Sequence, residues 1–229
     1  MNNRGIKYFL AELLIVTLGV SISLFMANLL EQKKSRQTEY EVLSVLEQNL
    51  QRDSLLVDYQ FMVLEKLVNG ASKLQEPEKI HSLDTLSECL DLFCSYSAFH
   101  FVTVGFTEIT TNRIVLSNDT LYRATLDYYT TVKDLVDEWG EIDKKYVLED
   151  VIPYMLDHFE HLKVRQTENG SFFGFEQMPE IESLHDKGVQ NRLVANLIYK
   201  QNIRALLQGL KGSNNRLLHR VQQELKTFK

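Results

Sequence analysis

An uncharged apolar run near the N-terminus constrains this chain more than any other feature. From Leu13 to Leu30 the sequence has eighteen consecutive residues without an acidic or basic side chain. A helix of this length is enough to span about 30 Å of hydrocarbon. Basic residues stand on both sides of the run: Arg4, Lys7, Lys33, Lys34 and Arg36. The run is uncharged around its whole circumference, which a buried core helix explains poorly. The sequence therefore predicts a transmembrane anchor over residues 1–32.

A cleaved signal peptide is the alternative to a retained anchor. It would have a shorter apolar region and small residues at positions −3 and −1, whereas a cut after Ala27 would place Phe25 at −3. The orientation rests on a weaker asymmetry, because two basic residues precede the span and three follow it. The short N-terminal tail has no acid before Glu12, and acids dilute the positive flank beyond the span. This favours an N-terminus inside and a domain outside.

Small residues recur on one face of the predicted span. Gly19, Ser23 and Ala27 are four residues apart and would let another transmembrane helix approach closely. Small residues are also common in transmembrane helices, so the alignment can arise by chance. Glu12 either reaches the interface near Lys7 or is a buried functional carboxylate. The expected partners are the membrane and a second copy or another membrane protein, and nucleic acid is an unlikely partner.

The apolar segment and the residues after it also resemble a known family. The shared pattern consists of Tyr8, Glu12, Leu14 to Val16, Gly19, Ser23, Asn28 and Glu31, followed by a charged helix. It resembles an uncharacterised family of bacterial single-pass membrane proteins, a domain of unknown function. The family's Asn-Trp-Asn-Glu exit is Asn28-Leu29-Leu30-Glu31 in this chain, without the Trp. A second similarity covers Thr107–Ile109, Ser117–Leu121 and Tyr128-Tyr129. The resemblance implies an anchored helical domain of a bacterial membrane protein and supplies no catalytic residues. In a bacterial inner membrane, the orientation favoured by the flanking charges would place the domain in the periplasm.

The composition beyond the anchor favours helices. Only 10 Gly and 3 Pro interrupt the 229 residues, and the turn signals lie far apart. This pattern is typical of long helices rather than of short strands with frequent turns. We therefore expect an all-α fold, in which the transmembrane helix continues into a long stalk helix packed in an antiparallel helical bundle. One helical soluble domain would occupy residues 33–229.

The stalk helix is expected over residues 33–70. No helix breaker follows the membrane exit until Asn69-Gly70, and Gly70 suits the left-handed cap that ends such a helix. Apolar residues keep a helical spacing along this stretch. They are Leu43, Leu46, Leu50, Val57, Phe61, Leu64 and Val68.

Middle helices are expected over residues 82–163. Ser82 caps the first, the state of residues 96–109 is left open, and a clearer helix begins at Ser117 or Asn118. Its seam alternates in steps of four and three: Leu121, Thr125, Tyr128, Val132, Leu135, Trp139, Ile142 and Tyr146. Such a heptad-like seam occurs in coiled coils, and its Thr and Tyr residues favour packing inside a bundle. Pro153 should end or kink this helix. The aromatic stretch 171–179 is predicted to be a loop whose Phe side chains fill a core.

A basic helix is expected over residues 186–228, capped by Asp186. Its apolar face comprises Leu193, Leu197, Ile203, Leu207, Leu210, Leu217, Val221, Leu225 and Phe228. From Lys187 onward there are nine Lys or Arg residues against the single Glu224. One interpretation is a surface for anionic lipid or nucleic acid. The other, which we favour, is packing beside an acidic helix with Asp127, Asp134, Asp137, Glu138 and Glu141.

Residues that could carry chemistry are few. Two Glu-x-x-His pairs fit the pattern of di-iron bundles: Glu78 with His81, and Glu182 with His185. His158 and His161 lie among acids within one and a half helical turns and could hold a divalent metal, although a solvated polar face explains them equally simply. Cys89 and Cys94 are expected to be free thiols, unless a loop lets them form a disulfide. The sequence contains no phosphate loop or nucleophile elbow, so no catalytic residue and no cofactor is predicted.

The leading functional hypothesis follows from architecture. It is a membrane-anchored helical interaction or sensory scaffold that assembles partly through its transmembrane helix. Two alternatives stay open: a metal-dependent helical-bundle enzyme, and an anionic-lipid-binding protein.

Overall fold

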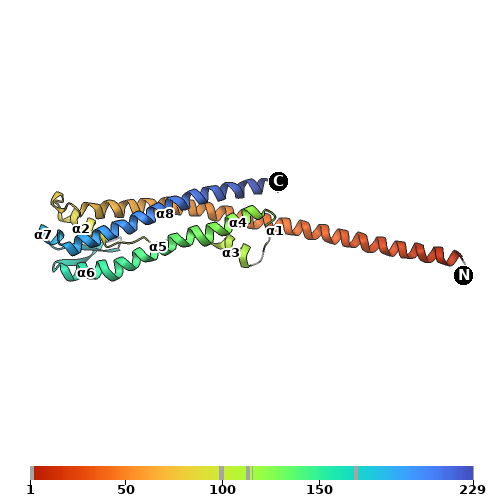
Figure 1. The fold of residues 1–229 in the computed structure, drawn as a ribbon, viewed down its shortest axis with the longest axis horizontal. Coiled ribbons are helices and arrows are strands. Elements are labelled where there is room, and N and C mark those ends of the chain that lie inside the picture. Colours follow the sequence, from red (N-terminus) through yellow and green to blue (C-terminus); the bar gives the residue numbers. More distant parts are fainter. Residues whose placement is uncertain (1–2, 98–100, 112–113, 115, 168–169, 229) are drawn as a thin grey trace.

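The computed structural model describes residues 3–97, 101–111, 114, 116–167 and 170–228. Its longest element is α1 (Asn3–Lys73), which contains both the apolar run and the expected stalk in one helix about 105 Å long. The N-terminal half of α1 projects alone beyond the other helices (Figure 1), and every residue from Glu12 to Gln37 is exposed. The bundle begins at Glu39, the first buried residue of α1 among those with described side chains.

The bundle is built on an antiparallel pair of helices. α8 (Lys187–Lys226) runs back along the C-terminal half of α1, so that the C-terminus lies near the point where α1 leaves the bundle (Figure 1). Buried residues of α1 alternate in steps of four and three: Glu39, Leu43, Leu46, Leu50, Asp53, Val57, Gln60, Leu64, Leu67 and Ala71. On α8 the same steps give Val189, Leu193, Asn196, Lys200, Ile203, Leu207, Leu210, Asn214, Leu217 and Val221. The expectation of an all-α fold with an antiparallel helical bundle is confirmed.

Shorter elements cover this pair. They are η1 (Pro77–Lys79), α2 (Leu83–Phe93), α3 (Val104–Thr111), α4 (Asp119–Asp127), η2 (Tyr128–Val132), α5 (Lys133–Tyr146), η3 (Val147–Val151), α6 (Ile152–His158), β1 (Leu162–Thr167), β2 (Gly170–Phe175) and α7 (Ile181–Leu184). One apolar core joins α1, α3, α4 and the C-terminal half of α8. The other core joins the end of α1 to α2, α6, the antiparallel hairpin of β1 and β2, and the start of α8.

The helix starts proposed from capping residues are confirmed. Ser82 accepts a hydrogen bond from the backbone N–H of Thr85 at the start of α2. Asn118 accepts one from Leu121 N–H at 3.0 Å, and this cap begins α4. Asp186 accepts from the N–H groups of Gly188 and Val189 at the start of α8. Each side chain satisfies a backbone donor that has no partner within its own helix.

The predicted seam of the middle helix is correct only in its first half. Leu121, Thr125 and Tyr128 are buried, but Leu135 and Ile142 are 41% and 38% exposed. The reason is η2, a π-helical turn over Tyr128–Val132 that adds one residue to the helix and buries Tyr129 next to Tyr128. Beyond it the buried face moves by one position, to Val136, Gly140, Asp143 and Val147.

Pro153 was expected to end or kink its helix. The helix does not end there, because a second π-helical turn, η3, precedes this residue and the chain continues into α6. The expectation of an aromatic loop was wrong. The aromatic stretch is not a loop but part of an antiparallel hairpin, in which β2 pairs with β1. Its neighbour Asn169 lies outside the described residues. The expected core role holds for Phe175, which is fully buried against Phe159 at a ring distance of 5.2 Å.

Gly70 does not cap α1, which continues to Lys73. The residue instead permits close contact between two helices. A Cβ atom at position 70 would lie 2.3 Å from Leu92 Cδ1 and 2.7 Å from Leu92 Cβ on the neighbouring α2. The absence of a side chain at this position therefore lets α2 pack against the end of α1.

We expect Gly70→Ala to lower the stability of the bundle by about 1–3 kcal/mol, because the added methyl group forces α2 away from α1. Gly209→Ala is the matched control: it lies within α8 with nothing within 4 Å of the added atom, and should raise stability by about 0.5–1 kcal/mol. Thermal unfolding followed by circular dichroism measures both. An equal change in the two variants would contradict the packing role of Gly70.

Candidate functional site

The four residues singled out in the apolar segment lie on the free half of α1. Glu12, Gly19, Ser23 and Ala27 are all exposed, and nothing lies within 4 Å of a Cβ atom placed on Gly19. The bundle of the same chain does not cover this face. Packing of the stripe against another transmembrane helix therefore stays a prediction.

The two histidines proposed as metal ligands lie near the hairpin. His158 has its Nε2 atom 3.2 Å from the carbonyl oxygen of Ser183, and its ring stacks on Tyr154. His161 is exposed, in the turn before β1. The structure does bring the two Glu-x-x-His motifs together, because His185 Nε2 lies 3.3 Å from Glu78 Oε2. Among the described residues no group of three or more His, Cys, Asp or Glu side chains is placed to hold a metal ion.

The cysteines are free and buried, as expected. Burial raises the pKa of the Cys94 thiol to about 12, so this sulfur is a poor nucleophile at neutral pH. Near it lies an ion pair that sequence reasoning missed. Lys200 Nζ lies 3.2 Å from Asp143 Oδ1, and neither side chain is exposed. Burial lowers the pKa of Lys200 and raises the pKa of Asp143, so each group relies on the other to stay charged.

A second buried polar group joins three elements in the middle of the bundle. Asp53 of α1 accepts hydrogen bonds from Val102 N–H at 3.1 Å and from the Tyr128 hydroxyl at 3.3 Å. Asn214 of α8 donates to the same hydroxyl at 3.0 Å and to the carbonyl of Leu50 at 3.1 Å. Burial raises the pKa of Asp53 to about 6, against the opposing effect of these hydrogen bonds. We call Asp53, Tyr128 and Asn214 the central polar cluster.

Three basic residues of α8 pair with acids, as the favoured interpretation expected, but their partners are not the acids that it named. Arg192 pairs with Asp150, Lys200 with Asp143, and Lys211 with Asp58 of α1. Of the acids named from the sequence, Asp137 and Glu141 instead pair with lysines on their own helix. The acidic partners therefore come from α1 (Asp58), from α5 (Asp143) and from η3 (Asp150).

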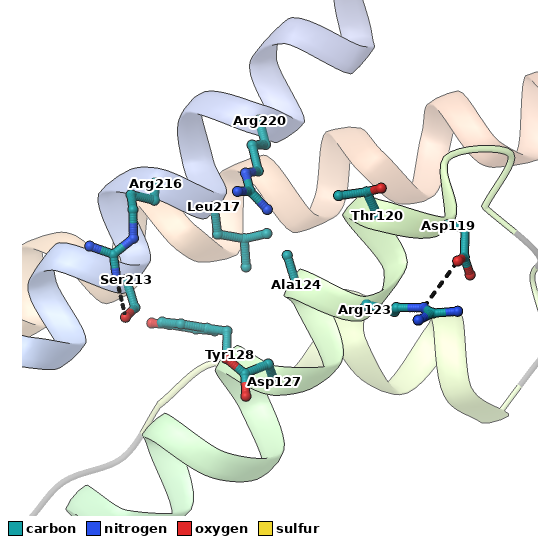
Figure 2. Close-up of a pocket in the computed structure, with 10 residues that line it drawn as sticks. All are labelled: Asp119, Thr120, Arg123, Ala124, Asp127, Tyr128, Ser213, Arg216, Leu217 and Arg220. Atoms are coloured by element: carbon teal, nitrogen blue, oxygen red, sulfur yellow. Dashed lines mark hydrogen bonds and ion pairs between the residues drawn. The ribbon is translucent and has the colours of Figure 1, made fainter.

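A cleft of about 510 Å³ opens between α4 and α8. Figure 2 shows Arg216, Leu217 and Arg220 extending from α8 on one side and Arg123 and Ala124 from α4 on the other. Tyr128, a member of the central polar cluster, also lines the cleft and is only 2% exposed. Tyr128 thus connects the cleft to the buried hydrogen bonds with Asp53 and Asn214.

Arg123, Arg216 and Arg220 line this cleft together with Asp119 and Asp127. Asp119 neutralises Arg123 at 3.0 Å. Arg216 donates to the Ser213 hydroxyl at 2.9 Å. Arg220 has no hydrogen-bond or ion-pair partner among the residues that the structure describes. Within the described part of the chain, the guanidinium groups of Arg216 and Arg220 therefore have no carboxylate partner.

Sequence reasoning missed Asp53, Lys200 and Asn214 as core residues. A signal for them exists, because the apolar face predicted for α8 has gaps at positions 200 and 214, each seven residues from an apolar residue on either side. A polar residue in such a gap continues the seam and is buried with it. Tyr129 and Asp143 gave no comparable signal, since their burial depends on the π-helical turn.

Comparisons with known proteins add nothing to this picture: no family model, no curated protein and no solved structure matches the chain.

The raised pKa of Asp53 predicts a pH-dependent stability. The folded state binds the proton of the Asp53 carboxyl group more tightly than the unfolded chain does. The protonated carboxyl group therefore contributes to the free energy of unfolding in full below about pH 4, and this contribution is lost as pH rises through about 6. A pKa of about 6 in place of 3.8 corresponds to about 3 kcal/mol. Asp53→Asn should reduce the dependence of the free energy of unfolding on pH in this range. Denaturant unfolding of both proteins between pH 4 and 8 measures it, and identical slopes would contradict the assignment.

Proposed function

We propose that the chain is a single-pass membrane protein whose apolar segment crosses the bilayer and whose helical bundle serves as an interaction or sensory scaffold beside it. One observation carries the proposal. The apolar window of α1, with a mean hydropathy of 2.2, has no buried residue in the folded chain, and the same helix continues without a break into the bundle.

Insertion into a membrane explains why the apolar segment is exposed in the folded chain. Its large apolar side chains between Leu13 and Leu30 are 44–68% exposed. A soluble monomer rarely exposes a contiguous apolar surface of this extent, because each buried square ångström contributes about 25 cal/mol. Lipid removes the whole surface from water without any contact from the bundle.

The side of the bundle nearest the segment suits a membrane interface. The C-terminal Phe228 lies 5.9 Å from Tyr40 between ring centroids, and the guanidinium of Arg36 lies 5.4 Å from the Phe228 ring. Aromatic and basic side chains of this kind gather at the membrane–water boundary. The bundle begins at Glu39, within about three helical turns of Leu30 at the end of the apolar run, so it would lie close to the membrane surface.

The sensory part of the proposal rests on the continuity of α1. Asp53, in the bundle seam, and the apolar segment belong to one helix. A displacement of that helix by a partner or ligand at the bundle would reach the membrane segment directly. The basic residues Arg4 and Lys7, with no acid between them and Glu12, favour a cytoplasmic location for this flank and a bundle on the opposite face, which in a bacterial inner membrane is the periplasm.

Val16→Lys combined with Ile22→Lys should remove the protein from the membrane, because a lysine at the centre of a span costs about 2.5–3.5 kcal/mol. The matched control is Leu55→Lys, a change of the same kind at a 72% exposed position of α1 within the bundle. Wild type and control should resist alkaline carbonate extraction and the double variant should not. Wild-type protein that is extracted by carbonate would contradict the proposal.

A further inference from the structure

The cleft between α4 and α8 concentrates positive charge in a way that the fold does not require. Arg216 and Arg220 are four residues apart, one turn along α8, and both line the cleft. Like charges at this spacing destabilise a helix by about 0.2–0.5 kcal/mol. Elsewhere on α8, Arg192, Lys200 and Lys211 each have a carboxylate within 3.2 Å. The arginine pair has none among the described residues.

The other groups around the pair are suited to the same kind of ligand. The hydroxyls of Thr120 and Ser213 add donors, while Ala124, Leu217 and the Tyr128 ring supply an apolar wall. A volume of about 510 Å³ lies within the range of pockets that hold small molecules. Guanidinium groups bind carboxylate and phosphate oxygens in forked, charge-assisted hydrogen bonds.

We propose that this cleft binds a small molecule carrying an oxyanion group, a carboxylate or a phosphate, through Arg216 and Arg220. The oxyanion neutralises both guanidinium groups, and the Arg216 side chain exchanges its hydrogen bond with Ser213 for charge-assisted bonds. Asp127 is the other acid that lines the cleft, and its carboxylate repels a ligand that carries further negative charge.

The position of Tyr128 gives such binding a route to α1. Its ring lines the cleft, and its hydroxyl lies 3.3 Å from Asp53 Oδ2 on α1 and 3.0 Å from Asn214 Nδ2 on α8. A ligand that draws α4 and α8 together acts on Tyr128, which directly follows α4, and on Asn214 of α8, and through the Tyr128 hydroxyl on Asp53 of α1. This step rests on the proposed sensory function, whereas the binding itself does not.

Titration calorimetry of the full chain in detergent tests the site with two probes, sodium phosphate and sodium succinate, at constant pH and ionic strength set with sodium chloride. We expect saturable binding of at least one probe, and the probe that binds identifies the oxyanion. Arg216→Gln combined with Arg220→Gln should weaken binding about tenfold or more, since each charge-assisted hydrogen bond contributes about 1.5–3 kcal/mol. Arg204→Gln, an exposed arginine of α8 away from the cleft, is the matched control and should bind as wild type does.

No binding of either probe overturns the proposal, as does equal affinity in the double variant and the control. Circular dichroism shows whether the double variant keeps its helices, which it should because both side chains are exposed. The protein is solubilised throughout, so failure to bind leaves membrane anchoring untouched, and failure of carbonate-resistant anchoring leaves this result unaffected.

Discussion

The antiparallel contact between α1 and α8 is the interaction on which the rest of the bundle depends. Each helix places a buried residue every third or fourth position along nearly its whole contact length, so the pair forms one long apolar seam. The two apolar cores both include residues from α1 and α8. The shorter helices and the hairpin then cover the sides of this pair, and Gly70 lets α2 approach closely.

Polar side chains interrupt the apolar seam and fix how α8 aligns with α1 and with α5. Asp53 and Asn214 meet at the Tyr128 hydroxyl, and Lys200 meets Asp143. A buried polar group without its partner costs about 1–3 kcal/mol, and a buried charge more. Sliding α8 by one heptad along α1 would separate these groups while leaving apolar residues in contact. The polar pairs therefore select one register, which an apolar seam alone would specify weakly.

Local patterns predicted much of the fold, and long-range geometry explains the rest. Spacing and caps gave the long helices, the all-α class and the helix starts at Ser82, Asn118 and Asp186. They failed where one extra residue enters a helix: the turn at Tyr128–Val132 moves burial from Ile142 to Asp143. No propensity predicts that turn. The arginine cleft was equally hidden, because Arg123 and Arg220 lie 97 positions apart and line one cleft only after α4 packs on α8.

The apolar segment and the bundle share one continuous helix, α1. Spin labels attached through Ile22→Cys and Leu55→Cys, with Cys89 and Cys94 replaced by alanine, would report this in lipid nanodiscs. Both labelled positions are exposed. They are 33 residues apart, which places them about 50 Å apart in a continuous α-helix. Pulsed dipolar spectroscopy should give one narrow distance distribution near that value. A broad distribution, or one centred well below it, would contradict the account.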